Sequence, residues 1–404
     1  MKLSIITCVC NTSIEYVDAC LRSIKNSTLK EGEYEVILVD DGSQVDYTKI
    51  RKKYNPVYVK TENRGHLAAR LFGIMLARGE YITFVDSDDT VSANYHAPML
   101  ACAEKQGCDL VLGDWAFLSG KTRAYPKNDI VIKDDIDLKE DEALDFYFSA
   151  EGKFHSVFVL WNKLFKRELL LRAKAEIEKT DAIMSRYTYS EDALITFFAY
   201  KNAKHIKNVH TGYYFYRTHA GQGVVAEGFD SLASKIAHMT STLNIMEAHT
   251  ENDSHKNGIC AWRGIMARAH YSHAKGQGLK SLYPLILDKY KQEKLQASKP
   301  SDDYGYMATG LIASNLEDID SALVKITKEE DPVYVNYDKK DSYVVNFFRE
   351  TGKAVVYLDT AKHYVPRAQI STKDKITHSP LAYFIALRLF KKGSKARKKL
   401  KGKV

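Results

Sequence analysis

The sequence lacks the glycine patterns on which two large classes of nucleotide-binding proteins depend. Residues 3–10 read as a buried strand, and the turn that follows, Asn11-Thr12-Ser13, contains no glycine. A dinucleotide-binding fold needs Gly-x-Gly-x-x-Gly at this place, and a P-loop needs two glycines followed by Lys and then Ser or Thr. The turn therefore excludes both classes. It also argues against a nucleotidyltransferase, which would carry a glycine-rich, basic first loop.

Paired cysteines and long apolar runs are missing as well. The six cysteines, at positions 8, 10, 20, 102, 108 and 260, include no Cys-x-x-Cys pair. This spacing favours reduced thiols in a cytosol over disulfides or a zinc site. No apolar run reaches the about 18 residues of a membrane-spanning helix, and the first ten residues form a strand pattern instead of a signal peptide. We therefore expect a cytoplasmic protein with no membrane-spanning helix.

An excess of positive charge is absent outside the C-terminal tail. The formal net charge of the 404 residues is +8, but residues 388–404 alone contain nine Lys or Arg and no acid. Residues 1–387 contain 50 basic and 51 acidic side chains. A nucleic-acid-binding surface spread over the whole protein is therefore excluded, and we expect no nucleic-acid partner.

The first half does contain a regular alternation of strands and helices. Strand patterns occupy residues 3–10, 34–39, 57–60, 81–85 and 109–112, and apolar residues at helical spacing lie between them. A helix is expected to begin at Trp161, and a further strand is expected at residues 213–217. This alternation predicts an α/β fold with a mostly parallel sheet and helices on both faces.

Carboxylates cluster where two of these strands end. Asp40 and Asp41 follow the second strand, and Asp86, Asp88 and Asp89 follow the fourth. Ligands bind at the carboxyl ends of the strands in open α/β sheets, and carboxylates there hold a divalent ion that also binds a phosphate. Acids at both strand ends suit a sugar nucleotide. The alternatives are a helix N-cap for one acid of the second group and an ordinary turn for the first group.

Seven short motifs connect the chain to a known family. They are Ser4-Ile-Ile-Thr7 with Asn11, Val39-Asp-Asp-Gly-Ser43, Asn63-x-Gly-x-x-x-Ala-Arg70, Phe84-Val-Asp-Ser-Asp-Asp89, Trp161-Asn-Lys-Leu-Phe-Lys-Arg167, Glu191-Asp192 and Tyr216-Arg217. In this order they resemble family 2 glycosyltransferases, which have the GT-A (Rossmann-like) fold. The resemblance covers roughly residues 1–220.

The resemblance implies roles for individual residues. Asp40 or Asp41 would hold the base, taken to be uracil, and Arg70 would lie near the base or the diphosphate. Asp86 would reach the ribose, and Asp88 would bind Mn²⁺ or Mg²⁺ that bridges the diphosphate. The nucleotide-binding candidates are Thr7, Asn11, Asp40, Asp41, Asn63, Arg70, Asp86 and Ser87, the metal candidates are Asp88 and His219, and the acceptor-side candidates are Trp161, Lys163 and Arg217.

Some of these residues also have ordinary explanations. The alternative for Arg70, on a helix, is a solvated face, and the functional role is favoured over it. His219 is equally compatible with a surface position. The glycines after His219 suggest a mobile lid.

The family also implies a general base. Asp192, with Glu191 as its neighbour, matches the residue that removes the proton from the acceptor hydroxyl in inverting members, and general-base catalysis needs a carboxylate within hydrogen-bond reach of that hydroxyl. The alternative is purely structural. Ser190 would cap a helix whose first turn carries both acids.

The second half of the chain shows structural patterns but no catalytic motif. We divide the chain into a GT-A catalytic domain (1–225), a helical connection (226–302), a small α/β C-terminal appendage (303–370) and an amphipathic, basic tail (371–404). Strands are expected at 321–326, 333–336 and 354–358, with a helix at 342–351. The appendage could also self-associate, which makes an oligomer an open alternative.

The tail joins an apolar segment, 381–390, to the nine basic residues. Such a segment is expected to lie on an anionic membrane with its apolar side buried and its lysines near the headgroups. Three alternatives remain: a solubilising tail, a strip that docks on the protein itself, and attraction to an anionic polymer acceptor.

We therefore expect a metal-dependent, inverting glycosyltransferase. It would move a sugar from a UDP-sugar to a hydroxyl of a lipid-linked or polymeric cell-surface glycan, at the inner face of the cell membrane, as in capsule, teichoic-acid or exopolysaccharide assembly. The alternatives are a non-catalytic protein on the same scaffold that binds a glycan or an anionic polymer, and a nucleotidyltransferase. The intact Asp86, Asp88 and Asp192 argue against the non-catalytic alternative.

Overall fold

The computed structural model describes most of the first 286 residues and two short strands beyond them. The described residues are 1–126, 132, 134–140, 142–149, 154–218, 228–282, 285–286, 333–336 and 355–358. The chain divides into two compact units, of which the first comprises Met1–Val225 and His238–Ile259 and the second Ala226–Ala237 and Cys260–Val404. Among the described helices, none combines the length and the apolar character needed to cross a membrane.

The N-terminal half of the main sheet is parallel. It contains β1 (Leu3–Val9), β2 (Tyr34–Asp41), β3 (Val57–Thr61) and β4 (Tyr81–Phe84) in the order β3-β2-β1-β4. β1, β2 and β4 are buried over nearly their whole length, which explains their continuous runs of Ile, Leu and Val. All four predicted strands are confirmed, and their bounds differ from the predicted ones by two residues or fewer.

The other half of the sheet is mixed. β9 (Lys163–Lys166) lies between β4 and β6 (Leu110–Ser119) and runs antiparallel to both. β10 (His205–Arg217) pairs in parallel with β6 and antiparallel with β5 (Thr90–Val91) and β8 (Asp137–Lys139), while β7 (Thr122–Ala124) pairs with β6. A mostly parallel sheet is therefore a correct description of the first half only.

The helix predicted to begin at Trp161 starts later than expected. The residues that follow form β9, and α7 (Arg167–Ile177) begins only after it. Leu164 and Phe165 are completely buried because β9 fills the place between β4 and β6. A strand of four residues is too short for its alternation to be told apart from the first turn of a helix.

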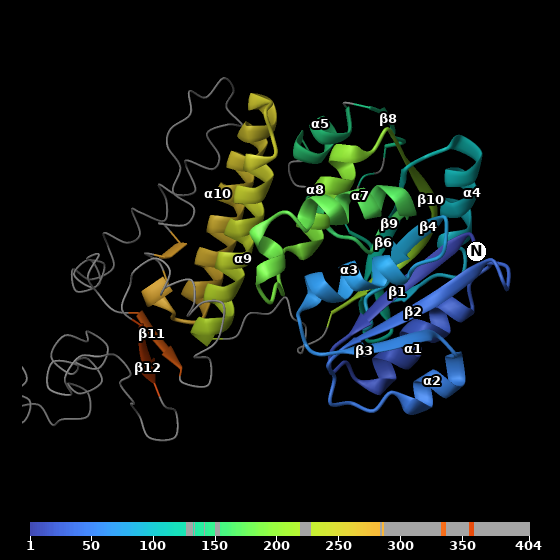
Figure 1. Ribbon diagram of the computed structural model, residues 1–404, viewed down its shortest axis with the longest axis horizontal. Coiled ribbons are helices and arrows are strands. Elements are labelled where there is room, and N and C mark those ends of the chain that lie inside the picture. The colour runs from blue at the N-terminus through green and yellow to red at the C-terminus, as the bar shows by residue number, and fades with distance from the viewer. Residues whose placement is uncertain are drawn as a thin grey trace, which may run out of the picture. The chain divides into compact units, whose positions relative to one another are not determined.

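Helices cover both faces of the sheet, as predicted (Figure 1). On one face α3 (His66–Leu76) packs against β1 and β2 and contacts α7 and α8 (Glu191–Asn202). This packing is tight, because a Cβ added at Gly73 would lie 2.6 Å from Ile6 Cγ2. On the other face α1 (Ile14–Lys25), α2 (Thr48–Tyr54) and α4 (His96–Gln106) enclose an apolar core with Leu3 and Ile5 of β1. The remaining helices of this part are α5 (Glu142–Ser149), α6 (Phe154–Phe158) and the 3₁₀ turn Asp181–Met184.

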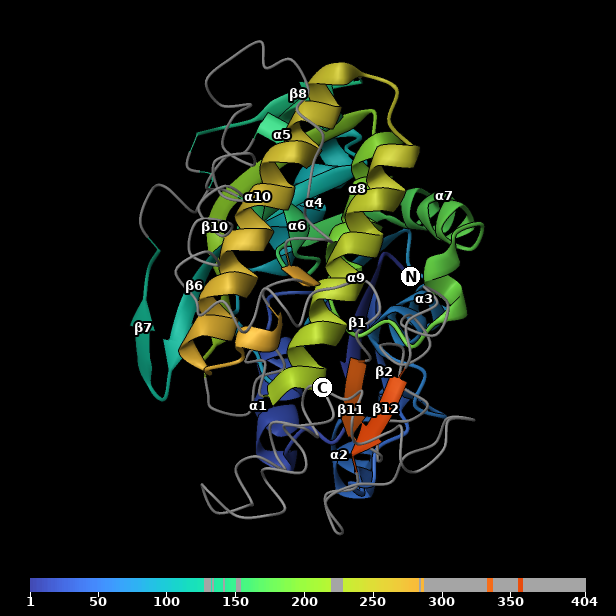
Figure 2. The ribbon, with the colours of Figure 1, turned by 90° about the vertical axis from the view of Figure 1, so that its left-hand side faces the viewer.

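Two long helices follow the sheet. α9 (Gly228–Ala248) and α10 (Asp253–Gly276) lie side by side in both views (Figures 1 and 2), and a 3₁₀ turn at Lys280–Leu282 follows them. β11 (Val333–Asn336) and β12 (Val355–Leu358) pair in parallel, which confirms two of the predicted strands. The predicted strand at 321–326, the predicted helix at 342–351 and the tail lie outside the described residues, and the proposed domain bounds stay predictions.

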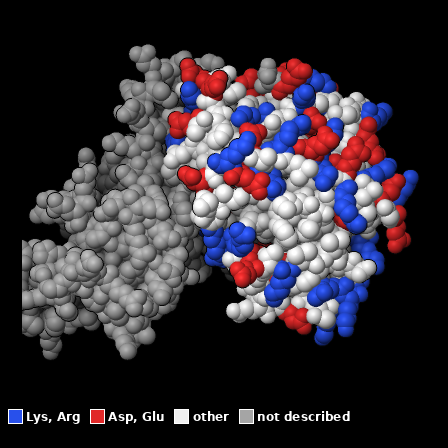
Figure 3. Space-filling model, viewed as in Figure 1, with Lys and Arg blue, Asp and Glu red and all other residues white. Residues whose placement is uncertain are grey.

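Charges of both signs are interspersed over the face of the molecule that Figure 3 shows. Lys and Arg side chains alternate there with Asp and Glu, as the nearly balanced composition of residues 1–387 leads one to expect.

Candidate functional site

The loops that follow β1, β2 and β4 are joined by hydrogen bonds. The backbone N–H of Asn11 donates to Ser43 Oγ (2.9 Å), and Asn11 Oδ1 accepts from the N–H of Gln44 (2.8 Å). The hydroxyls of Thr12 and Ser87 share a hydrogen bond of 2.8 Å. Asn11 and Ser87, two of the predicted nucleotide-binding residues, therefore fix the three loops to one another at the carboxyl ends of the strands, where such sheets bind ligands.

Asp40 is completely buried and both of its carboxylate oxygens accept hydrogen bonds. Oδ1 accepts from the N–H of Ser43 (2.7 Å), and Oδ2 accepts from the hydroxyl of Tyr58 (2.6 Å). Burial and then the Asp40 contact raise the pKa of the Tyr58 phenol. Asp40 thus shapes the turn after β2, and contact with a base stays a prediction for it.

Asp41 links the same turn to the loop before α3. Its Oδ1 accepts from the N–H of Arg64 (2.7 Å) and its Oδ2 from the N–H of Gly65 (3.0 Å). Gly42 has φ +74°, and a Cβ there would lie 2.6 Å from the backbone nitrogen of Asn63. The Asp40-Asp41-Gly42-Ser43 motif is therefore more than an ordinary turn, because it packs against the loop that contains Asn63, another predicted nucleotide-binding residue.

Arg70 lies at the centre of the site. Its Nη2 donates to Asp86 Oδ1 (3.1 Å), its Nη1 lies 2.8 Å from Asp192 Oδ1, and Nη1 also contacts Glu191 Oε1. The side chain is 10% exposed, so the solvated-face alternative is wrong. Burial acts to lower the pKa of Arg70, but Asp192 and Asp86 outweigh it and the pKa is raised. A buried guanidinium needs such partners, because a buried charge is costly unless it is paired.

Glu191 and Asp192 begin α8, but Ser190 before them does not cap the helix with its side chain, as the structural alternative requires. Ser190 has φ +60° and its hydroxyl shares a hydrogen bond of 2.8 Å with that of Thr242. No side-chain cap is formed. The side chain of Asp192 is 20% exposed and that of Glu191 only 7%. Burial raises the pKa of Asp192, and Arg70 opposes this shift. Capping by Ser190 therefore does not explain the two acids.

The three acids after β4 have different surroundings. Asp89 is completely buried, and its carboxylate accepts from the Tyr214 hydroxyl (2.6 Å) and the N–H of Arg217 (2.7 Å). It is followed by β5 (Thr90–Val91) and not by a helix, so the helix-cap alternative is wrong for Asp89. Asp86 and Asp88 are partly exposed. Burial raises the pKa of Asp86, with Arg70 acting against this shift and Asp88 adding to it.

The residues present fit a divalent ion bound jointly with a diphosphate. No group of three or more His, Cys, Asp or Glu side chains in the described ranges is arranged to hold a metal by itself. Asp88 and Asp86 nevertheless place two like charges next to each other at an accessible turn, and this repulsion contributes to the raised pKa of Asp86. A hard cation with oxygen ligands would relieve that repulsion. His219 and the predicted lid lie outside the described residues.

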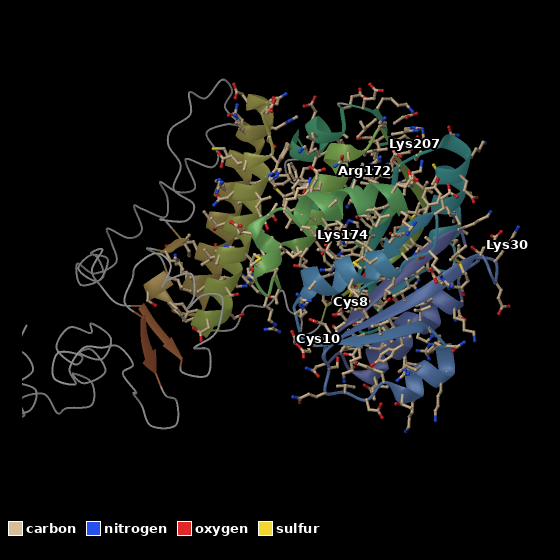
Figure 4. All side chains as sticks on the ribbon, viewed as in Figure 1. Cys8, Cys10, Lys30, Arg172, Lys174 and Lys207 are labelled. Carbon is tan, nitrogen blue, oxygen red and sulfur yellow. The ribbon has the colours of Figure 1, made fainter. Side chains whose placement is uncertain are left out.

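Two predicted contacts with substrate are ruled out by burial. Thr7 is fully buried inside β1, opposite Leu38 of β2, two residues before the end of the strand (Figure 4 labels its neighbour Cys8). Lys163 is also fully buried, and its ammonium donates to Ser156 O (2.7 Å), Val159 O (2.6 Å) and Asn162 Oδ1 (2.6 Å). Burial lowers its pKa well below the usual range. Lys163 thus closes the loop before β9 and does not reach an acceptor.

The other two acceptor-side candidates have different positions from those expected. Trp161 is 4% exposed and stacks on Tyr214 at 4.5 Å between ring centroids, so it is part of the core. Arg217 Nε donates to the carbonyl oxygen of Asp88 (2.5 Å), and its guanidinium lies 4.9 Å from the ring centroid of Tyr16. Arg217 is therefore next to Asp88, the predicted metal-binding residue, and not among the residues expected to contact the acceptor.

Tyr214 and His66 were not among the predicted site residues, and Tyr216 was noted only as part of the Tyr216-Arg217 motif. Tyr214 donates to Asp89 and accepts from the N–H of Asp86 (3.0 Å). Tyr216 lies two residues further along β10. His66 Nδ1 lies 3.4 Å from Glu191 Oε1. The aromatic alternation at the end of β10 was visible in the sequence, but only the pairing of β10 with β5 brings it to the acids after β4.

Comparison with known proteins gives a family match and several relatives. The model of the family described as "Glycosyl transferase family 2" matches residues 4–172. The chain is 30% identical over 226 residues to the putative glycosyltransferase EpsH of Bacillus subtilis, an alignment that covers 54% of this chain and 61% of the relative. It is 32% identical over 227 residues to a poly(ribitol-phosphate) beta-glucosyltransferase of Bacillus spizizenii, which covers 54% of this chain and 32% of the relative. The chain thus spans from a third to three fifths of these relatives.

The fold is also found in a solved structure. The crystal structure of residues 1–349 of S. aureus TarS matches with a TM-score of 0.54 and 20% identity, over 82% of this chain and 94% of that chain. At this identity the likeness concerns the fold alone, and it confirms the predicted GT-A arrangement. The family match thus places a glycosyl transferase family 2 domain at residues 4–172 of this chain.

Proposed function

We propose that the chain is an inverting glycosyltransferase that moves a sugar from a UDP-sugar to a hydroxyl of a polymeric or lipid-linked glycan. The observation that carries this proposal is the position of Arg70. One guanidinium contacts Asp86, the predicted ribose-binding carboxylate, and Asp192, the predicted general base. The two groups come from distant parts of the sequence, and a transfer reaction needs both next to the same sugar.

Asp192 is the group that accepts the proton in this mechanism. Its carboxylate removes the proton from the acceptor hydroxyl while the hydroxyl oxygen forms a bond to the anomeric carbon. The bond from that carbon to the diphosphate oxygen breaks, and its electron pair leaves with UDP. Attack from the side opposite the leaving group inverts the anomeric configuration. The side chain of Asp192 is 20% exposed, which supports this role because a general base must reach its proton.

Arg70 keeps this base in the required state. Burial alone would keep Asp192 protonated to a higher pH, and the neighbouring guanidinium counteracts this by favouring the ionised form. The same guanidinium holds Asp86. We therefore assign Arg70 a positioning role between the donor and the base.

Asp88, next to Asp86, would hold Mn²⁺ or Mg²⁺ together with the diphosphate. When bound, such an ion neutralises charge on the departing diphosphate. Arg217 supports this arrangement from the protein side, because its bond to the Asp88 carbonyl oxygen fixes the backbone of the turn.

The acceptor class is supported by the relatives. The relative from Bacillus spizizenii is named a poly(ribitol-phosphate) beta-glucosyltransferase. TarP of Staphylococcus aureus is named a poly(ribitol-phosphate) beta-N-acetylglucosaminyltransferase, and it is 24% identical over 53% of this chain and 62% of its own length. We extend this to the present chain as a polymeric cell-surface acceptor, reached at the inner face of the membrane. The basic residues 388–404 would contact anionic lipid there.

A thermal-shift screen of UDP-, GDP- and dTDP-sugars, with and without Mn²⁺, tests the donor. A ligand that binds the native state at 100 times its Kd adds about 2.7 kcal/mol to the free energy of unfolding. We expect a rise in melting temperature with UDP-sugars, larger when Mn²⁺ is present. Equal shifts with all three nucleotide classes, or none with UDP-sugars, would contradict the proposal.

A further inference from the structure

Tyr216 occupies a distinctive place on β10. Side chains two residues apart on a strand share a face, so Tyr216 lies on the same face as Tyr214, whose hydroxyl bonds to Asp89. Tyr214 is completely buried, whereas Tyr216, one step closer to the end of the strand, is partly exposed. Arg217, the next residue, bonds to the backbone of Asp88. Tyr216 is therefore at the opening of the site, beside the 86–89 turn.

The ring of Tyr216 is held in place by its neighbours. It stacks on Trp161 with centroids 5.7 Å apart and planes at 27°, and it meets the edge of Phe117 at 6.2 Å. Both neighbours belong to a buried aromatic group that includes Trp115. The orientation of the phenol is thus fixed before any substrate binds, which reduces the entropy that binding must overcome.

The hydroxyl of Tyr216, beside the 86–89 turn, forms no hydrogen bond to any residue that the structure describes. Burial raises its pKa first, and Asp89, Asp86, Asp88 and Asp192 raise it further. These carboxylates belong to both sides of the proposed reaction. A polar group that is held rigidly and whose hydroxyl has no partner in the described part of the chain is suited to bind a ligand.

In-line displacement limits which part of the substrate can lie here. In the proposed function Asp86 reaches the ribose, Asp88 holds the metal ion together with the diphosphate, and Asp192 takes the proton of the attacking hydroxyl. The transferred sugar would then lie between Asp88 and Asp192. We propose that Tyr216 binds this sugar, with its hydroxyl hydrogen-bonded to a hydroxyl or N-acetyl group of the ring. This inference rests on the proposed function. It adds a residue that contacts the sugar of the donor and not its UDP part.

The test compares binding of UDP with binding of UDP-glucose and UDP-N-acetylglucosamine to the full chain, in the presence of Mn²⁺. Tyr216→Phe removes only the hydroxyl and keeps the ring. Loss of one neutral hydrogen bond weakens binding by about 3- to 10-fold. We therefore expect Kd for at least one UDP-sugar to rise by this factor, while Kd for UDP stays within about twofold of the wild type. Unchanged UDP binding also shows that the variant is folded.

Tyr213→Phe is the matched control, because Tyr213 lies on the opposite face of β10 and stacks on Phe215. It should leave all three Kd values unchanged. If Tyr216→Phe changes UDP and UDP-sugar binding equally, or changes neither, the proposal for Tyr216 is overturned while the proposed function stands. If the wild type binds none of the three probes, the proposed function itself fails and the role of Tyr216 fails with it.

Discussion

Arg70 is the residue whose surroundings most directly determine the chemistry of the site. Its guanidinium is 2.8 Å from Asp192 Oδ1 and 3.1 Å from Asp86 Oδ1. Burial raises the pKa of Asp192 and Arg70 opposes the rise. Because a general base at Asp192, as proposed, must be ionised, activity should increase as the pH rises through the pKa of Asp192. This limb should lie above the ordinary Asp value of about 3.9.

Arg70→Gln should therefore move the acid limb of kcat/KM to higher pH, since removing the positive charge lets the carboxylate keep its proton longer. Arg70→Lys retains the charge and should leave the limb close to that of the wild type, although its weaker geometry reduces the rate. The pH profiles of the three proteins check this. A limb that shifts equally in both variants would show that charge is not the cause.

The three acids after β4 illustrate what could be predicted from single residues. Their position at a strand end indicated a site, and in the structure Asp86 accepts a hydrogen bond from Arg70. Asp89 could not be assigned correctly, because its partners Tyr214 and Arg217 are more than 120 residues away in the sequence. The predicted substrate contacts of Thr7 and Lys163 were wrong for a related reason. A motif shows which residues occur together but not which of them are buried.

At the scale of elements, the turn after β2 should be sensitive to any side chain at Gly42. Gly42 and Gly107 both have positive φ, but an added Cβ meets the backbone of Asn63 at 2.6 Å in the first case and no atom within 4 Å in the second. Gly107→Ala should cost about 1–2 kcal/mol of unfolding free energy from backbone strain alone. Gly42→Ala should cost more and should also weaken UDP binding, as denaturant unfolding and titration can show. If Gly42→Ala and Gly107→Ala change the free energy of unfolding and UDP binding to the same extent, this account is contradicted.

β9 depends on the buried ammonium of Lys163. The ammonium donates to three oxygens of the segment that precedes β9, one in α6 and two in the loop after it. Buried acceptors that lose their donor cost about 1–3 kcal/mol. Lys163→Met should reduce the free energy of unfolding by that amount. Lys166→Met, at the other and less buried end of the same strand, is the control and should change it by less than about 0.5 kcal/mol. If the two variants are equally stable, the loop does not depend on Lys163.

β9 and β10 also show why half of the sheet was predicted well and the other half was not. β1 to β4 alternate with helices, so each strand is set apart by a change of period. β9 has only four residues and no such boundary. β10 was predicted from residue 213 but begins at His205, because its first part is interrupted by an irregularity between Val209 and Tyr213.

At the scale of the whole molecule, charge is separated along the sequence. Residues 1–387 are nearly neutral and residues 388–404 carry nine basic side chains. Each Lys or Arg near an anionic membrane contributes about 1 kcal/mol. Replacing the nine basic residues by Gln in the full chain should abolish co-sedimentation with vesicles that contain anionic lipid, while turnover of a soluble acceptor is kept. Unchanged sedimentation would rule out the tail as the membrane contact.

Transfer by the Asp192→Asn variant tests the central claim most directly. The measurement is transfer from UDP-glucose or UDP-N-acetylglucosamine with Mn²⁺, together with UDP binding by the same proteins. The acceptor probe is poly(ribitol phosphate), the polymer named for two relatives. Asn keeps the shape of Asp192 but cannot take a proton, so transfer should fall by about 10²- to 10⁴-fold, while Kd for UDP stays near that of the wild type. The exposed Glu178→Gln serves as the control. Transfer by Asp192→Asn at a rate near that of the wild type would contradict the account.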